Sequence, residues 1–170
     1  AIQDLALTTN GILLAAQADS LRAAGLHRLT VSLDTLQADR FQRLTRFDEL
    51  DAVLRGLGTA AHAGFNSLKI DTVVIRNIND DEIVDVLEHG RGLGAEVRFI
   101  EYMDVGGATR WTIDDVVSRQ QILEIIGASY GSVTLIDEDA SAPADRFCLP
   151  DGTIFGIISS TTEPFCSQCD

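Results

Sequence analysis

The sequence predicts an α/β protein in which four strand–helix units precede a small antiparallel extension. Three stretches share the order helix, glycine, strand, at residues 23–34, 62–74 and 92–103. Each glycine is placed to end its helix in the left-handed conformation, just before the chain enters a strand. Repeated crossovers of this kind put successive strands parallel in one sheet. The chain of 170 residues is 45% hydrophobic, so it can bury a core of domain size.

The first two units contain short apolar runs followed by helical spacing. A strand is expected near residues 2–7, and a second over residues 28–34. Further along, apolar residues recur at intervals of three and four, which is the spacing of one helical face. They are Leu50, Val53, Leu54, Leu57, Ala60 and Ala61. This spacing predicts a helix over residues 50–61.

The next two units follow the same order. A strand is predicted over residues 69–74, and the acidic residues 80–82 fall in the first turn of the helix that follows, where negative charge is favourable. In a fourth strand Val97 and Phe99 share one face. The alternation fails at residues 100–101, so a bulge or the end of the strand is expected there.

Alternating side chains favour one of the two folds that parallel strands form, a doubly wound sheet or a barrel of the TIM type. In the second strand Leu29, Val31 and Leu33 oppose Thr30, Ser32 and Asp34, and in the third Ile70, Thr72 and Val74 oppose Lys69, Asp71 and Val73. Central strands of a doubly wound sheet are apolar on both faces. A polar face therefore favours a barrel whose interior holds a polar ligand, and four strands make that barrel incomplete.

The composition changes after about residue 104, so residues 1–104 are assigned to the partial barrel and residues 105–170 to the extension. Residues 106–115 are loop-like, and residues 118–127 predict a short helix. Shorter strands are expected within GSVTLIDED, RFCLP and TIFGIISS, with the turn residues 150–152 between the last two.

Charge and cysteine content restrict the class of function. The 13 basic and 26 acidic residues give a net charge of −13, which argues against non-specific nucleic-acid binding. No run of about 18 apolar residues could span a membrane, and the first residues lack the basic region of a signal peptide. Three cysteines outside any disulfide framework favour a reducing compartment. The expectation is a soluble cytoplasmic protein that binds an anion only through a local basic pocket.

Two cations lie on the proposed interior face, Lys69 and Arg98. Burying either without a partner is costly, so the sequence leaves two alternatives open. One is an ion pair with Asp71 or Glu96, and the other is binding of an anionic ligand.

Polar residues near two strand ends are further candidates. Thr8-Thr9-Asn10-Gly11 is expected just past the first strand, and Ser32 near the carboxyl end of the second, the side where α/β barrels place their sites. Thr, Asn and Gly are also ordinary turn residues, so a turn without a binding role is the alternative.

Cys166 and Cys169 form a CxxC pair, a spacing at which two thiolates can bind one metal centre. A ligand set that lacks its remaining members is the preferred interpretation, and two incidental thiols are the alternative. Cys148, within an apolar run, is expected to be a buried small hydrophobe. The three histidines are expected to be surface residues: His27, His62 and His89.

Taken in order, five segments resemble the GTP 3′,8-cyclase family, the MoaA-type radical S-adenosylmethionine enzymes of molybdenum cofactor biosynthesis. They are LTTNG (7–11), VSLDTL (31–36), AGFNSLKIDTVVIRNIND (63–80), RFIEYMDVG (98–106) and FCSQC (165–169). The ordered set covers the middle portion of a family member. The family's CxxxCxxC loop and its glycine-rich motif are absent, and its third C-terminal cysteine and GTP-binding arginines are expected beyond Asp170.

The resemblance implies a partial radical-SAM barrel. It also implies conversion of GTP to (8S)-3′,8-cyclo-7,8-dihydroguanosine 5′-triphosphate by a 5′-deoxyadenosyl radical. The family's site residues correspond to Thr8, Lys69 and Arg98 for GTP, to Ser32 and Met103 for S-adenosylmethionine, and to Cys166 and Cys169 for the second of two [4Fe-4S] clusters. A downstream pterin-forming synthase is the implied pathway partner, and a homodimer is compatible. The 170 residues alone are expected to be inactive, because they lack the motif that generates the radical.

Two other functions remain open from the sequence. One is a radical-SAM enzyme that modifies peptides, since many of these carry C-terminal cysteine clusters. The other is a non-catalytic half-barrel that binds an anionic nucleotide. Its unpaired outer strands would favour aggregation or pairing with another chain.

Overall fold

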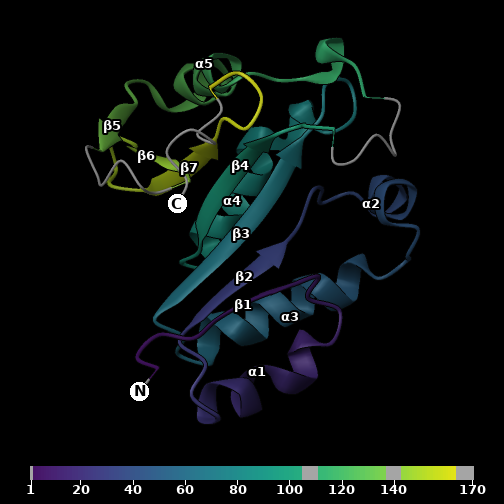
Figure 1. Cartoon of the computed structure of the whole chain (residues 1–170), viewed down its shortest axis with the longest axis vertical. Coiled ribbons are helices and arrows are strands. Elements are labelled where there is room, and N and C mark those ends of the chain that lie inside the picture. The colour runs from purple at the N-terminus through teal and green to yellow at the C-terminus, as the bar shows by residue number, and fades with distance from the viewer. Residues whose placement is uncertain (1, 105–110, 137–142, 164–170) are drawn as a thin grey trace. The chain divides into compact units, whose positions relative to one another are not determined.

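The computed structural model describes residues 2–104, 111–136 and 143–163 (Figure 1). The helices and strands are β1 (Ala6–Thr9), α1 (Leu14–Ala23), β2 (Arg28–Ser32), α2 (Ala38–Thr45), α3 (Leu50–His62), β3 (Ser67–Val74), α4 (Ile83–Gly92), β4 (Glu96–Glu101), α5 (Arg119–Tyr130), β5 (Thr134–Ile136), β6 (Asp145–Cys148) and β7 (Ile154–Ile158), with 3-10 turns at Asp80–Glu82 and Ile113–Asp115. The chain divides into two compact units, residues 1–72 with 88–97, and residues 73–87 with 98–170.

Parallel strands form the sheet of the first unit. β1 pairs with β2 and β2 with β3, and the register aligns Thr8 with Thr30 and Thr30 with Lys69. The sequence predicted that the first strand begins near residue 2, whereas β1 begins at Ala6. The carbonyl of Leu5 accepts the amides of His27 and Arg28, and the first residue pair of the ladder is Ala6 with Arg28. The strand therefore starts where the second strand supplies hydrogen-bond partners.

Helices α1 and α3 are in contact and run beside β1 and β2 (Figure 1). They enclose the apolar face of the strands, where Leu29, Val31 and Ile70 are fully buried. The opposite face is half-buried at Thr30 and Lys69. The predicted alternation of the second and third strands is thus confirmed.

Three glycines end helices as predicted. Gly25 follows α1 with φ +98°, Gly64 follows α3 with φ +76°, and Gly94 follows α4 with φ +66°. Helix α2 was not predicted. Within it only Phe41 is buried, so its sequence has too few apolar repeats to show the helical period.

The second unit contains the antiparallel strands. β5 pairs with β6, and β6 with β7. The predicted turn joins the last two: Gly152, at φ +89°, donates its amide to the carbonyl of Leu149 at 2.9 Å. Phe155 lies between Phe99 and Phe147, with ring centroids 6.4 and 5.4 Å away. The order of hydrogen-bonded neighbours among the strands is β1-β2-β3-β4-β7-β6-β5.

The end of β4 differs from the sequence expectation. The strand ends at Glu101, which was one of the two alternatives, but the alternation does not fail there. Glu101 is fully buried on the same face as Val97 and Phe99. A carboxylate replaces an apolar side chain at this position because hydrogen-bond donors surround it, as described below.

The α/β class with parallel strand–helix units followed by antiparallel strands is confirmed. The boundary at residue 104 stays a prediction. Among the described residues, no helix has both the length and the apolar character needed to cross a membrane.

Candidate functional site

The polar face of the parallel strands carries two of the candidate residues, Thr8 and Lys69. Thr8, Thr30 and Lys69 occupy one row across β1, β2 and β3. Thr8 lies within β1 and not just past it, because the strand begins later than predicted. Adjacent strands are about 4.8 Å apart, so the backbones of Thr8 and Lys69 are separated by roughly 10 Å across the row. Thr30 was not singled out from the sequence, although its place on the polar face could be read from the alternation.

Lys69 has a carboxylate neighbour on this face. Its Nζ lies 3.7 Å from Oε1 of Glu96, and the two side chains are only 17% and 15% exposed. The predicted ion pair with Glu96 is therefore present. The separation exceeds hydrogen-bond length, so this contact is electrostatic. Binding of an anion by Lys69 stays a prediction.

Ser32 lines a cavity of 150 Å³ at the carboxyl ends of β1 and β2. The cavity is lined by Asn10, Ile12, Ser32, Asp34, Phe41, Thr45 and Phe47. This lining combines polar groups with aromatic rings, which suits a ligand with both polar and flat apolar parts. Sites for drug-sized molecules span about 300–1,000 Å³, so this cavity fits only part of a nucleoside-containing ligand.

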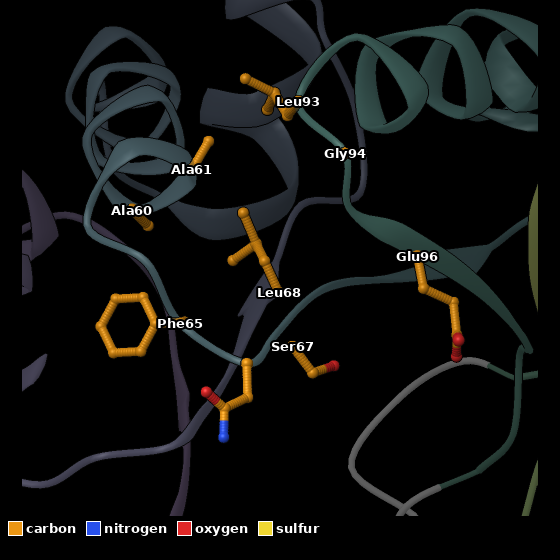
Figure 2. A pocket seen from close by; sticks show the side chains of 9 residues that line it. Ala60, Ala61, Phe65, Ser67, Leu68, Leu93, Gly94 and Glu96 are labelled. Carbon is orange, nitrogen blue, oxygen red and sulfur yellow. The ribbon is translucent and has the colours of Figure 1, made fainter.

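A larger cavity of 240 Å³ lies at the other end of the strands (Figure 2). It is lined by Ala60, Ala61, Phe65, Asn66, Ser67, Leu68, Leu93, Gly94 and Glu96. Ala60 and Ala61 come from the last turn of α3, and Gly94 from the loop entering β4. Sites in α/β barrels lie at the carboxyl ends of the strands. We therefore assign the candidate site to the smaller cavity and to the polar row beside it.

Arg98 and Met103 belong to the second unit. Arg98 is half-buried in β4, on the face opposite Val97 and Phe99. A Cβ atom on Gly156 would lie 3.2 Å from its Cγ, so the glycine leaves room for the arginine stem. Met103 is 43% exposed just after β4. Contact of these two residues with a ligand held by the first unit stays a prediction.

The cysteines divide between described and undescribed parts of the chain. Cys166 and Cys169 lie outside the described residues. Cys148 is half-buried in β6, where its thiol donates to the carbonyl of Leu149 at 3.3 Å, so it is less buried than predicted. Residues 2–104, 111–136 and 143–163 contain no cluster of three or more His, Cys, Asp or Glu side chains that could hold a metal ion.

The histidines have different environments. His62 is exposed, as predicted, and His27 is half-buried with Nδ1 accepting the Leu5 amide at 3.2 Å. His89 is half-buried, and its Nε2 atom is shielded from solvent. This burial lowers the pKa of His89.

Comparison with known proteins shows relatives along the whole chain. A protein of Mycobacterium bovis named GTP 3′,8-cyclase 3 is 54% identical over 169 residues, which are 99% of this chain and 45% of the relative. GTP 3′,8-cyclase 1 of Mycobacterium tuberculosis is 52% identical, with coverage of 99% and 47%. GTP 3′,8-cyclase of Xanthomonas axonopodis pv. citri is 46% identical, with coverage of 99% and 51%. The chain thus spans about half the length of the curated relatives it matches.

Two family profiles and one solved structure agree with this similarity. The solved structure, TYW1 with a lysine-pyruvate adduct bound, superposes with a TM-score of 0.56 at 20% identity, over 89% of this chain and 45% of the other. That match shows a shared fold. The profile described as Molybdenum Cofactor Synthesis C matches residues 95–170. The profile of the Radical SAM superfamily matches residues 1–90, more than half of the chain, so the chain belongs to the radical SAM superfamily.

Proposed function

We propose that the intact protein is a GTP 3′,8-cyclase of molybdenum cofactor biosynthesis. The observation that carries the proposal is the 54% identity over 169 residues with a protein of that name. Radical SAM enzymes in general use S-adenosylmethionine and a [4Fe-4S] cluster. When bound, these groups would supply a 5′-deoxyadenosyl radical to remove the 3′ hydrogen of the GTP ribose; the ribose carbon would then bond to C8 of guanine, and a reductant would supply the electron that completes the reaction.

In this proposal the polar row holds the triphosphate. Lys69 supplies a half-buried ammonium group, and Thr8 supplies a hydroxyl in the same row of the sheet. Arg98 adds a guanidinium group from β4. Charge-assisted hydrogen bonds to phosphate are needed because the chain as a whole repels anions, with a net charge of −13.

S-adenosylmethionine is proposed to contact Ser32 and Met103. The cavity beside Ser32 supports this assignment, because it has the polar and aromatic lining that a sulfonium nucleoside requires. Met103 is accessible for such a contact, at 43% exposure.

The extension is proposed to carry the second of two clusters. Cys166 and Cys169 are the proposed ligands from residues 105–170, and residues 1–104 bind the substrates. We further propose that the enzyme acts in the cytoplasm, forms a homodimer and passes its product to a pterin-forming synthase.

The test uses the intact protein, reconstituted with iron and sulfide under anaerobic conditions. GTP deuterated at the ribose 3′ position, S-adenosylmethionine and a reductant are added, and the products are measured by mass spectrometry. We expect deuterium in 5′-deoxyadenosine and a cyclised nucleotide of the mass of GTP. Cleavage of S-adenosylmethionine without deuterium transfer would refute the cyclase and favour a peptide-modifying enzyme.

A matched pair of variants tests the polar row. Lys69→Ala should raise the KM for GTP by about tenfold or more, because one hydrogen bond to a charged group contributes about 1.5–3 kcal/mol. Arg28→Ala is the control, since Arg28 lies on the same face two residues before Thr30 and forms an exposed ion pair with Asp4. Equal KM values for the two variants would show that Lys69 does not hold the phosphates.

A further inference from the structure

Two arginines of the second unit lie on one face of the sheet, on either side of Gly156. The strands that carry these three residues are neighbours in the order β4-β7-β6. Arg146 of β6 is directly opposite Gly156 of β7 in the antiparallel ladder, so the two positions share a face. A Cβ atom on Gly156 would lie 3.2 Å from the Cγ of Arg98, so the Arg98 side chain extends over the same face. The two arginines therefore flank a position that has no side chain.

The spacing of these arginines suits a ligand with linked phosphates. Neighbouring strands are about 4.8 Å apart, so the backbones of Arg98 and Arg146 are separated by roughly 10 Å across β7. A guanidinium group presents its donors as a planar fork that matches the oxygens of a phosphate. Two such groups reaching over Gly156 from opposite sides can each bind a different phosphate of one ligand.

The residues beside Arg146 do not neutralise its charge. Ile136 of β5 is directly opposite it on one side and Gly156 on the other, and both are uncharged. The preceding residue, Asp145, lies on the other face of the strand because side chains alternate. There Asp145 pairs with Arg119 at 3.2 Å. The nearest carboxylate in the sequence is thus directed to a different cation.

The environment of the two arginines favours a bound anion. Arg98 and Arg146 are half-buried, and partly buried charges are screened by salt less than exposed ones. Both interact with other groups of the chain, but a guanidinium group has five donors and can hold a protein group and a ligand at once. Two positive charges on one face repel each other, and an anion between them relieves this repulsion. Such a pair is notable in a chain with 13 basic and 26 acidic residues.

We propose that Arg146 is a further substrate-binding residue, which together with Arg98 takes the linked phosphates of a nucleoside triphosphate. Gly156 is a positioning residue in this site, because a larger side chain would fill the space between the two arginines. The pair gives the enzyme its preference for a nucleotide over the free nucleoside. This inference rests on the proposed function, which supplies GTP as the substrate.

The experiment measures equilibrium binding to the intact protein, reconstituted with iron and sulfide under anaerobic conditions. The probes are GTP, guanosine and inorganic tripolyphosphate, in the parent and in Arg146→Gln. We expect the substitution to raise the Kd for GTP by about tenfold or more, because it removes charge-assisted hydrogen bonds to phosphate. Tripolyphosphate should lose affinity in parallel, and the Kd for guanosine should stay unchanged.

Other results would overturn the inference. An unchanged Kd for GTP would show that Arg146 does not touch the phosphates. Equal loss of GTP and guanosine would show a role in the fold alone. Tripolyphosphate binding that depends on Arg146, combined with GTP binding that does not, would show an anion site outside the substrate site.

Two further variants complete the design. Arg91→Gln is the matched control, because it makes the same change of charge at an exposed helix residue that pairs with Glu88, so the Kd for GTP should not change. If Arg146→Gln does not fold, Gly156→Val decides, since it keeps both arginines and fills the space between them. Affinity for GTP equal to that of the parent in this variant would overturn the inference.

The deuterium-transfer assay separates this inference from the proposed function. A parent protein that binds GTP through Arg146 but transfers no deuterium would refute the cyclase and leave the arginine site intact. Deuterium transfer with a KM for GTP that Arg146→Gln leaves unchanged would refute the arginine site alone. A parent protein that binds no GTP would overturn both.

Discussion

Gly56 makes the close contact between α3 and the start of α1. A Cβ atom at this position would lie 2.7 Å from the carbonyl oxygen of Gly11 and 3.0 Å from the Cβ of Leu14. The carbonyl of Gly11 is itself held, because it accepts the amide of Leu14 at 3.0 Å. Neither atom can yield by a side-chain rotation, so an alanine must push the two helices apart.

Two opposing effects determine how much Gly56→Ala changes the free energy of unfolding. Replacing glycine by alanine inside a helix stabilises it by up to about 1 kcal/mol. Overpacking a well-filled contact costs about 1–3 kcal/mol, and a clash with fixed backbone belongs near the top of that range. We therefore expect a net loss of about 1–2 kcal/mol, which lowers the melting temperature of a chain of this size by about 2–8 °C.

The same helix offers a control in Gly58→Ala, because no atom lies within 4 Å of a Cβ at Gly58. The helix-propensity gain then acts alone, and we expect stabilisation of about 0.5–1 kcal/mol. Thermal and urea denaturation of both variants measure the difference. Equal stabilisation by the two alanines would refute the close approach of α1 and α3. Because Asn10 and Ile12 flank Gly11 and line the carboxyl-end cavity, Gly56→Ala should also weaken binding of S-adenosylmethionine by the intact protein.

Two other predictions concern buried polar groups. Thr72 is 2% exposed and donates its hydroxyl to the carbonyl of Leu33 at 2.7 Å, so Thr72→Val should destabilise the chain by about 1–3 kcal/mol in urea denaturation. A valine variant as stable as the parent would argue against that hydrogen bond. The pKa of His89 is lowered by burial from its ordinary value of 6.5, so the unfolded chain takes up a proton at higher pH than the folded chain. Stability is therefore complete above pH 6.5 and falls as the pH decreases toward the lower folded pKa, and His89→Gln should flatten melting temperature against pH in that window. A slope unchanged by the substitution would exclude this role of His89.

The order of the parallel units could be predicted because local rules and tertiary structure agree there. Glycine at the end of a helix adopts a conformation that other residues avoid, so Gly25, Gly64 and Gly94 mark helix ends wherever the chain packs. The alternation in β2 and β3 was equally reliable, since helices cover one face of these strands. The start of β1 was not predictable from residues 2–7 alone, because a strand extends only as far as its neighbour provides partners.

The candidate site could be predicted in part. The sequence placed Lys69 on the polar face, but the choice between ion pair and ligand contact depended on Glu96, which is 27 positions later in the chain and meets it only after folding. The alignment of Thr8 with Lys69 depends on the register of two strand pairs, which side-chain alternation does not fix. The lining of the cavity beside Ser32 includes Phe41 and Phe47 from the region of α2, a helix that the sequence did not reveal.

Glu101 shows why the alternation of polar and apolar residues gave a wrong prediction at the end of β4. The alternation rule assumes that a buried position takes an apolar side chain, because burying a charge without partners is expensive. At the end of β4 the partners are the amides of Arg119, Thr161 and Thr162, and the nearest of them is 18 residues away in sequence. No local window contains both the acceptor and its donors. A single break in an otherwise regular strand pattern, at an acidic residue near the carboxyl end, therefore indicates a position where distant segments of backbone converge.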